Sequence, residues 1–420
     1  MLNSNKQQFS FLSTLRIIIF TILLLFRSMP IFQHWFSTEI ELCFVIVGVF
    51  LLFPIEKNFF NRLFALLPIS VLFFLLQNLT RELGFISNLY NVIYGSFVFI
   101  LIIYLVNSTE ENRNILKFLF WVLIISISIT QITSIIALDK YPMLARFSIQ
   151  VTSRVHIDAH YGSDVSAYKL NMDGYGLAYL SPLYTTILYS LMKKKIFHPV
   201  LFAIHVALTL YFIFSTQFAI ALLLYLIIVT SILLSRGNIK KIALLAIIAF
   251  LLLPIFKNPI SDFFELLSDS VESDVLSVRF QEISTFLSSS SIKGSDLGAR
   301  LKAYSESLLV FFKNFFWGGW VVDAYNNLGH HSAILDYIAM SGVWGFFVLI
   351  LFFRTIYKEL TTAISKNENI QLLSLCFTVF IFTALFNPLF YLPQISGFLF
   401  AVAGVSTFLR EDICSPEETL

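Results

Sequence analysis

Long apolar stretches, separated by short polar segments, follow one another along almost the whole chain. Each stretch approaches the ~20 residues that a helix needs to cross the hydrocarbon layer of a bilayer. A strand in that layer would leave its edge groups unpaired, so the pattern predicts helices. The expected spans are residues 15–32, 42–55, 63–79, 85–106, 115–138, 175–192, 197–214, 218–234, 242–256, 332–353, 370–386 and 392–409.

The composition agrees with a chain that lies in lipid. Of the 420 residues, 57% are hydrophobic and 13% are charged, whereas about 25% are charged in a soluble domain. A soluble protein with so few polar side chains could not cover its surface. The net charge of +2 is too small to indicate a nucleic-acid partner. Cys43, Cys376 and Cys414 are scattered, which predicts neither a disulfide framework nor a metal site.

Basic residues concentrate in alternate connections, and this asymmetry indicates how the chain is oriented. With the N-terminus in the cytoplasm, the inner segments hold clusters such as Lys193-Lys194-Lys195, while the short outer loops hold only Arg81. The distribution predicts an all-α integral membrane protein with about twelve spans and both termini in the cytoplasm. The first span is expected to be retained, because no small-residue cleavage site follows it.

Two connections, residues 139–174 and 257–331, are much longer than the others, and this orientation places both on the outer side. They are rich in Tyr, Asp, Arg and His, so polar chemistry is expected there. Loops of this length are usually functional or disordered. The whole chain, residues 1–420, is expected to form one polytopic membrane domain.

The second long loop contains a predicted amphipathic helix that begins at Asp296. Apolar residues recur along one face of it at helical spacing, as in a helix that lies along a membrane interface: Leu297, Leu301, Leu308, Phe312 and Phe315. Trp317 and Trp320 follow, and tryptophan is enriched at the headgroup level. After a polar turn over residues 323–329, the chain reads His330-His331-Ser332, then Asp336, and enters the tenth span.

These motifs resemble the signature region of the O-antigen ligase/polymerase superfamily, which has Gly-Arg at an amphipathic helix, an Asn-Pro-hydrophobic-Gly turn, and His-Asn or His-Ser before a glycine-bearing helix. The similar segments are Gly298-Ala-Arg300, Tyr304, Phe311-Phe-Lys-Asn314, Gly318-Gly319, His331-Ser332-Ala-Ile-Leu335 and Ser341-Gly342-Val-Trp-Gly345. The chain departs from the family pattern at Ala299, at Phe315 in place of the proline, and at Gly318-Gly319. The arginine-plus-ten-then-glycine motif of some polymerases is absent from both long loops.

The resemblance implies a GT-C-like membrane glycosyltransferase, acting on sugars carried by undecaprenyl diphosphate at the periplasmic face of a bacterial inner membrane. The sequence shows no aspartate-rich motif for Mg²⁺, so arginine is expected to balance the diphosphate charge without a metal or cofactor. Arg300 is the first candidate, and Arg146, Arg154 and Arg279 are other loop candidates.

The acceptor sugar hydroxyl needs a base, and imidazole is a common one. His331 matches the family histidine, and His330 takes its place if the register differs by one. Tyr304 is expected either to bind sugar or to support Arg300. Asp336 is expected to orient the histidine, to hold an arginine, or to face water.

Other polar residues favour structural roles. Arg27 lies within the first span and is expected to pair with Glu39 or Glu41 rather than to meet the diphosphate. His205 is expected to be packed and hydrogen-bonded. The run 154–164 of the first long loop resembles a metal cluster only loosely, and a sugar-binding surface is the favoured interpretation.

Three functions remain open at this stage. The first is an O-antigen polymerase of the Wzy type, which transfers a growing glycan from its polyprenyl diphosphate onto a lipid-linked repeat unit. The second is an O-antigen ligase, which transfers the finished glycan to lipid A-core. The third is a flippase or transporter of lipid-linked sugars. The expected partners are the lipid-linked oligosaccharide, membrane lipids and a chain-length regulator protein.

Overall fold

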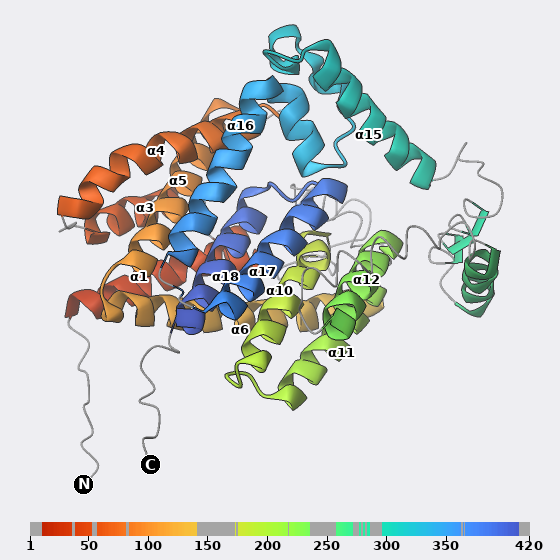
Figure 1. The fold of residues 1–420 in the computed structure, drawn as a ribbon, viewed down its shortest axis with the longest axis horizontal. Helices are drawn as coiled ribbons and strands as arrows, with labels where there is room; N and C mark the ends of the chain where they lie inside the picture. The colour runs from red at the N-terminus through yellow and green to blue at the C-terminus, as the bar shows by residue number, and fades with distance from the viewer. Residues whose placement is uncertain are drawn as a thin grey trace.

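The chain folds into a bundle of helices in the computed structural model (Figure 1). The structure describes residues 11–35, 38–52, 57–80, 84–140, 173, 175–216, 218–235, 258–271, 277–278, 280–281, 284–285, 296–362, 364 and 366–410. Its elements are α1 (Phe11–Ser28), α2 (Pro30–Trp35), α3 (Thr38–Leu52), α4 (Lys57–Asn78), α5 (Phe85–Asn107), α6 (Glu110–Lys140), α10 (Tyr175–Lys193), α11 (Pro199–Thr216), α12 (Ala219–Ser235), α15 (Asp296–Lys313), η1 (Gly319–Val322), η2 (Ala324–Asn327), α16 (Ala333–Thr361), α17 (Asn367–Phe386) and α18 (Leu392–Arg410). Residues 258–270 are also helical.

Six of these helices are long and apolar enough to cross a membrane: α5, α6, α11, α16, α17 and α18. Two shorter apolar segments, Arg62–Asn78 and Ile220–Ser235, accompany them. The protein is therefore an α-helical, membrane-embedded protein. Helices occur at eleven of the twelve expected spans, while the ninth, residues 242–256, lies outside the described residues. Twelve spans and their orientation stay a prediction.

The core is built largely from aromatic rings. Phe73 of α4 stacks on Phe352 of α16 with ring centroids 3.9 Å apart. Phe380 of α17 stacks on Phe398 of α18 at 4.0 Å. In Figure 1, α17 and α18 run through the middle of the bundle and α15 lies at its upper edge beside α16. Such stacking lets flat side chains fill the space between helices.

One end of the bundle is marked by buried basic residues, and we call it the basic end. The Arg16 side chain donates to the carbonyl of Leu51 at 2.8 Å. Arg410 donates to the carbonyl of Val106 at 2.6 Å. Asn107 donates to the Glu359 carboxylate at 2.9 Å. The start of α1 and the ends of α3, α5, α16 and α18 therefore meet at the basic end.

The opposite end holds the end of α1 and the starts of α3, α5, α10, α16 and α18. Arg27 makes a two-pronged ion pair with Glu41 at 2.8 and 2.7 Å, and it also contacts the Tyr90 hydroxyl. The expected structural role of Arg27 is thereby confirmed.

His205 contacts the hydroxyls of Thr185 and Thr209, which confirms its packed, hydrogen-bonded role as well.

The tenth expected span is not one continuous helix, because α16 breaks at Gly342 (φ 64°, ψ −158°). Only glycine adopts this conformation readily. The break frees the backbone N–H of Val343, which donates instead to the carbonyl of Phe315 at 2.8 Å. A Cβ atom on Gly342 would lie 2.7 Å from the Gly318 nitrogen, and Gly318 also has a positive φ of 83°. Two glycines thus let two backbone segments cross and fasten α15 to α16.

Candidate functional site

The helix predicted from Asp296 is present as α15, and it has two distinct faces. Arg300, Tyr304 and Ser307 are spaced four and three residues apart, so they share the face that meets the bundle. The apolar stripe runs along an adjoining face, where Leu308 is exposed and Phe312 is 69% exposed. An apolar stripe that is exposed within the described structure fits a helix lying on lipid, which stays a prediction.

Three tyrosines, Tyr175, Tyr179 and Tyr304, interact with Arg300, and a fourth, Tyr391, interacts with Tyr175. Tyr175 and Tyr179 come from the first turns of α10, Tyr304 from α15, and Tyr391 from the turn before α18. The rings of Tyr175 and Tyr179 lie 4.7 Å apart. We call Arg300 and these four residues the arginine–tyrosine cluster.

The guanidinium of Arg300 keeps its charge and has spare hydrogen-bonding capacity. Burial works against this charge, but the phenol oxygens of Tyr179, Tyr175 and Tyr304 more than offset it and raise the pKa of Arg300 above its usual value. Its Nη1 is buried without a hydrogen-bond partner. Within the described part of the chain, no carboxylate forms an ion pair with Arg300. A half-buried cation with a buried, unpaired nitrogen is suited to an anion brought from outside.

Tyr304 anchors α15 at this position. Its hydroxyl donates to the carbonyl of Phe386 at the end of α17, at 3.0 Å. Burial is the main reason why the pKa of Tyr304 lies above its usual value, so the phenol stays protonated and can donate. The hydrogen bond holds the face of α15 that carries Arg300 against the bundle, as expected of a residue that supports the arginine.

Asp336 organises the turn that carries the two histidines. Its carboxylate accepts a hydrogen bond from the Ser307 hydroxyl at 2.5 Å and another from the backbone N–H of Ser332 at 3.3 Å. The Ser307 hydroxyl in turn accepts from the backbone N–H of Gly329 at 3.1 Å. Of the expected roles, Asp336 therefore supports the histidine turn, and among the described residues it holds no arginine.

The two histidines have different surroundings. His330 has a positive φ of 55° and is exposed, and its ring packs on Tyr325 with centroids 4.6 Å apart. His331 is half-buried at the start of α16. The Ser332 side chain caps this helix by accepting from the N–H of Leu335 at 3.1 Å.

Three of the arginine candidates, Arg146, Arg154 and Arg279, lie outside the described residues, and so does the run 154–164. Of the remaining candidates, Arg300 and Tyr304 share one face of α15. Asp336 lies on the neighbouring helix α16 and contacts α15 through Ser307. The tyrosines of α10 were not among the residues predicted from the sequence. The four-residue spacing of Tyr175 and Tyr179 was the available signal, because it places both rings on one helix face.

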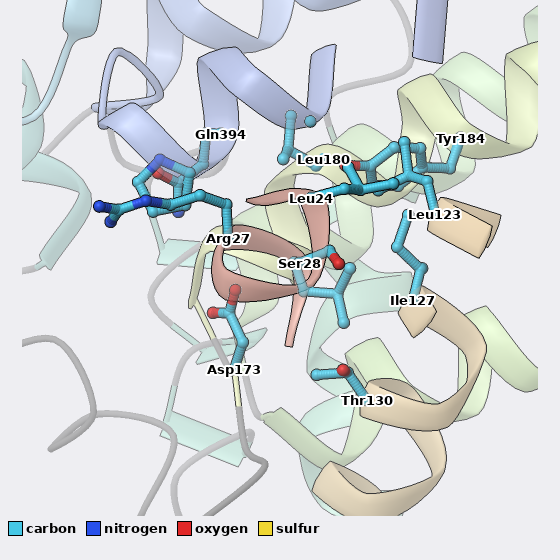
Figure 2. Close-up of a pocket in the computed structure, with 13 residues that line it drawn as sticks. Leu24, Arg27, Ser28, Leu123, Ile127, Thr130, Asp173, Leu180, Tyr184 and Gln394 are labelled. Carbon is cyan, nitrogen blue, oxygen red and sulfur yellow. The ribbon is translucent and has the colours of Figure 1, made fainter. Parts of the chain in front are cut away.

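A small polar cavity lies between α1, α6, α10 and α18 at the same end of the bundle (Figure 2). Its volume is about 30 Å³, which is enough for one or two water molecules. Its polar lining residues are Arg27, Ser28, Thr130, Asp173, Tyr184 and Gln394. Gly176 allows α10 and α18 to meet here, because a Cβ atom would lie 2.1 Å from the Gln394 Nε2.

Comparison with known proteins adds no name to this description. No known family model matches the chain, and no curated protein matches it closely enough to be counted a relative. The fold and the site define an α-helical membrane protein with a half-buried arginine among tyrosines near one end of its bundle.

Proposed function

We propose that this protein is a membrane-embedded glycosyltransferase that transfers a glycan from polyprenyl diphosphate to a sugar hydroxyl. The observation that carries the proposal is the arginine–tyrosine cluster: a half-buried cation with a buried, unused Nη1 and no carboxylate partner among the described residues. A lipid diphosphate is an anion held at the membrane surface, and a guanidinium binds such an anion through two parallel hydrogen bonds. The sequence resemblance supports the same substrate class.

The tyrosines extend the site beyond the phosphate. An aromatic ring presents an apolar face and a hydroxyl, so it can pack on a sugar ring and also bind a sugar hydroxyl. Tyr391 is 39% exposed, which leaves this side of the cluster accessible. The diphosphate would bind at Arg300, with the first sugars along Tyr175 and Tyr391. The exposed apolar face of α15 would rest on the lipid from which the polyprenyl chain enters.

His331 is proposed as the base or as the group that orients the acceptor hydroxyl, by its match to the family histidine. It is half-buried, and Asp336 accepts a hydrogen bond from the backbone N–H of the next residue, Ser332, so the backbone at this position is held in place. A fixed position favours catalysis, because small misplacements of a reacting group are costly. His330 packs on Tyr325 instead, which favours His331 of the two.

A polysaccharide polymerase at the periplasmic face of a bacterial inner membrane is the first choice, with the orientation predicted from the basic loops. Ligation of the glycan to lipid A-core is the alternative, since both reactions use the same donor. A flippase ranks third. It would need charges along a central path, whereas Arg300 and its tyrosines lie at one end of the bundle.

The test uses the full-length protein in liposomes with the lipid-linked oligosaccharide that accumulates in cells lacking the gene. A polymerase should lengthen the lipid-linked glycan and release free polyprenyl diphosphate, without lipid A-core. A ligase should release it only when lipid A-core is added. If the oligosaccharide crosses the membrane and no glycosidic bond forms, the glycosyltransferase proposal is wrong and transport takes its place.

A further inference from the structure

The cavity between α1, α6, α10 and α18 contains more polar atoms than the protein itself pairs. Thr130 is 1% exposed, and its Oγ1 has no hydrogen-bond partner in the described structure. The same holds for Ser28 Oγ and Gln394 Oε1, which line the same cavity. Buried polar atoms are nearly always paired, so three such atoms around one space indicate a polar occupant. The cavity has room for a hydroxyl group or water but not for a whole sugar ring.

Asp173 provides the carboxylate of this cavity. Its Oδ1 accepts from the backbone N–H of Gly176 at 3.0 Å, which caps the start of α10. Burial raises the pKa of the Asp173 carboxyl above its usual range, against the hydrogen bonds from Leu177 and Gly176 that lower it. A carboxylate with a raised pKa is a stronger base than ordinary aspartate.

The charged and titratable neighbours do not neutralise Asp173. Arg27 of α1 lines the same cavity, but its guanidinium pairs with Glu41 and extends away from Thr130 in Figure 2. Tyr184 of α10 is the other titratable group of the lining, and α6 and α18 contribute the uncharged Thr130 and Gln394. Among the described residues, Asp173 therefore faces a polar space without a cation of its own.

The cavity adjoins the arginine–tyrosine cluster. Asp173 lies two residues before Tyr175, and Gln394 lies three residues after Tyr391. Gly176, the residue after Tyr175, packs against Gln394 and Asp173 of the cavity lining. A Cβ atom there would lie 2.1 Å from Gln394 Nε2 and 3.2 Å from the Asp173 carboxylate. A sugar bound along Tyr175 could thus place one hydroxyl at the cavity.

Given the proposed function, on which this step rests, we infer that Asp173 is the base of the transfer. Its carboxylate takes the proton from the acceptor hydroxyl, whose oxygen bonds to the anomeric carbon of the donor sugar. The bond between that carbon and the diphosphate oxygen breaks, and its electron pair leaves with the polyprenyl diphosphate at Arg300. His331 then orients the acceptor.

Asp173→Asn separates this role from helix capping. Asparagine caps a helix start as well as aspartate does, but it cannot take a proton. The variant should reach the membrane in normal amounts and bind donor normally, while its transfer rate falls about 10²- to 10⁴-fold. Asp139→Asn removes an exposed carboxylate at the end of α6, and this matched control should keep the wild-type rate.

The pH dependence gives a second readout. The base must be deprotonated, so the wild-type rate should fall as the pH drops through the pKa of Asp173, and Asp173→Asn should lose this dependence. The contribution of Asp173 to the free energy of unfolding should change with pH in the direction opposite to the transfer rate. A raised folded-state pKa means that stability is lost as the pH rises through it, so the variant should melt no lower than wild type at pH 7.5.

Both readouts use the full-length protein in liposomes with the lipid-linked oligosaccharide described above. Asp173 is only a helix cap, and the inference is wrong, in either of two cases. In the first, Asp173→Asn keeps at least a third of the wild-type rate. In the second, the variant is slow but its rate still falls at low pH as the wild-type rate does. If the wild type itself forms no glycosidic bond, the proposed function fails, and this step fails with it. The two failures are distinguished by the wild-type rate alone.

Discussion

Replacement of Arg300 is the most direct test of the donor site. Arg300→Ala removes the guanidinium and both hydrogen bonds that a diphosphate would accept from it. A hydrogen bond to a charged group contributes about 1.5–3 kcal/mol, so two amount to roughly 3–6 kcal/mol. Since about 1.4 kcal/mol corresponds to tenfold, transfer should fall roughly 10²- to 10⁴-fold. Arg300→Lys keeps the charge but loses the planar fork, so it should lose one of the two bonds and recover little activity.

The structure also predicts that this loss is functional and not a failure to fold. Arg300 Nη1 makes no hydrogen bond within the described chain, so its removal breaks no internal contact at that atom. Lys302 is the matched control on the same helix. Its side chain is 77% exposed and pairs with Glu306 only at 3.6 Å, so Lys302→Ala should behave like wild type.

The assay compares glycan chain lengths on a gel after each variant is returned to a strain that lacks the gene, with protein amounts measured in the membrane. Near-normal chains from Arg300→Ala would refute the donor role. The diphosphate site would then have to be sought at Arg146, Arg154 or Arg279. Loss of activity together with loss of the protein from the membrane would instead show that Arg300 is structural.

Three further predictions concern the histidine turn before α16, the break of α16 at Gly342 and the two ends of the bundle. His331→Ala should abolish chain growth on the same gel, whereas His330→Ala should retain it, because His330 is exposed and packs on Tyr325 while His331 is half-buried. Gly342→Ala should lower the free energy of unfolding by at least about 1–3 kcal/mol, the usual cost of a strained backbone conformation. A cysteine at Asn326 should react with a membrane-impermeant maleimide in spheroplasts, and one at Asn367, near the basic end, should react only after permeabilisation.

Each of these measurements has an internal control. Gly84→Ala should leave the stability unchanged, because nothing lies within 4 Å of a Cβ atom there. The labelling requires a background in which Cys43, Cys376 and Cys414 are replaced. Reversed labelling would overturn the predicted orientation. An inactive His330→Ala beside an active His331→Ala would shift the motif by one residue.

The helices were predictable because lipid permits few alternatives to them. Apolar length alone placed helices at most of the expected spans, and apolar periodicity predicted the helix α15 that begins at Asp296. The pairing of Arg27 also followed from the sequence, since an arginine in a span needs a partner and Glu41 lay within reach.

The assembly of the site was not predictable in the same way. Arg300 meets Tyr175 and Tyr179, which lie more than a hundred residues earlier in the chain, and no periodicity links such distant segments. The break of α16 was also missed. A span rule counts apolar residues and does not register that Gly342 exchanges a helical hydrogen bond for one to Phe315.

The two-faced character of α15 makes the surrounding lipid a mechanical part of the site. Tyr304 and Ser307 hold one face of the helix, while Leu308 and Phe312 on an adjoining face are exposed. Replacing the bilayer with detergent removes the layer on which that face rests. Purified protein should therefore lose activity in detergent micelles before it loses helical structure, and it should recover activity in nanodiscs. The thickness of the bilayer should set the depth at which Arg300 meets the diphosphate.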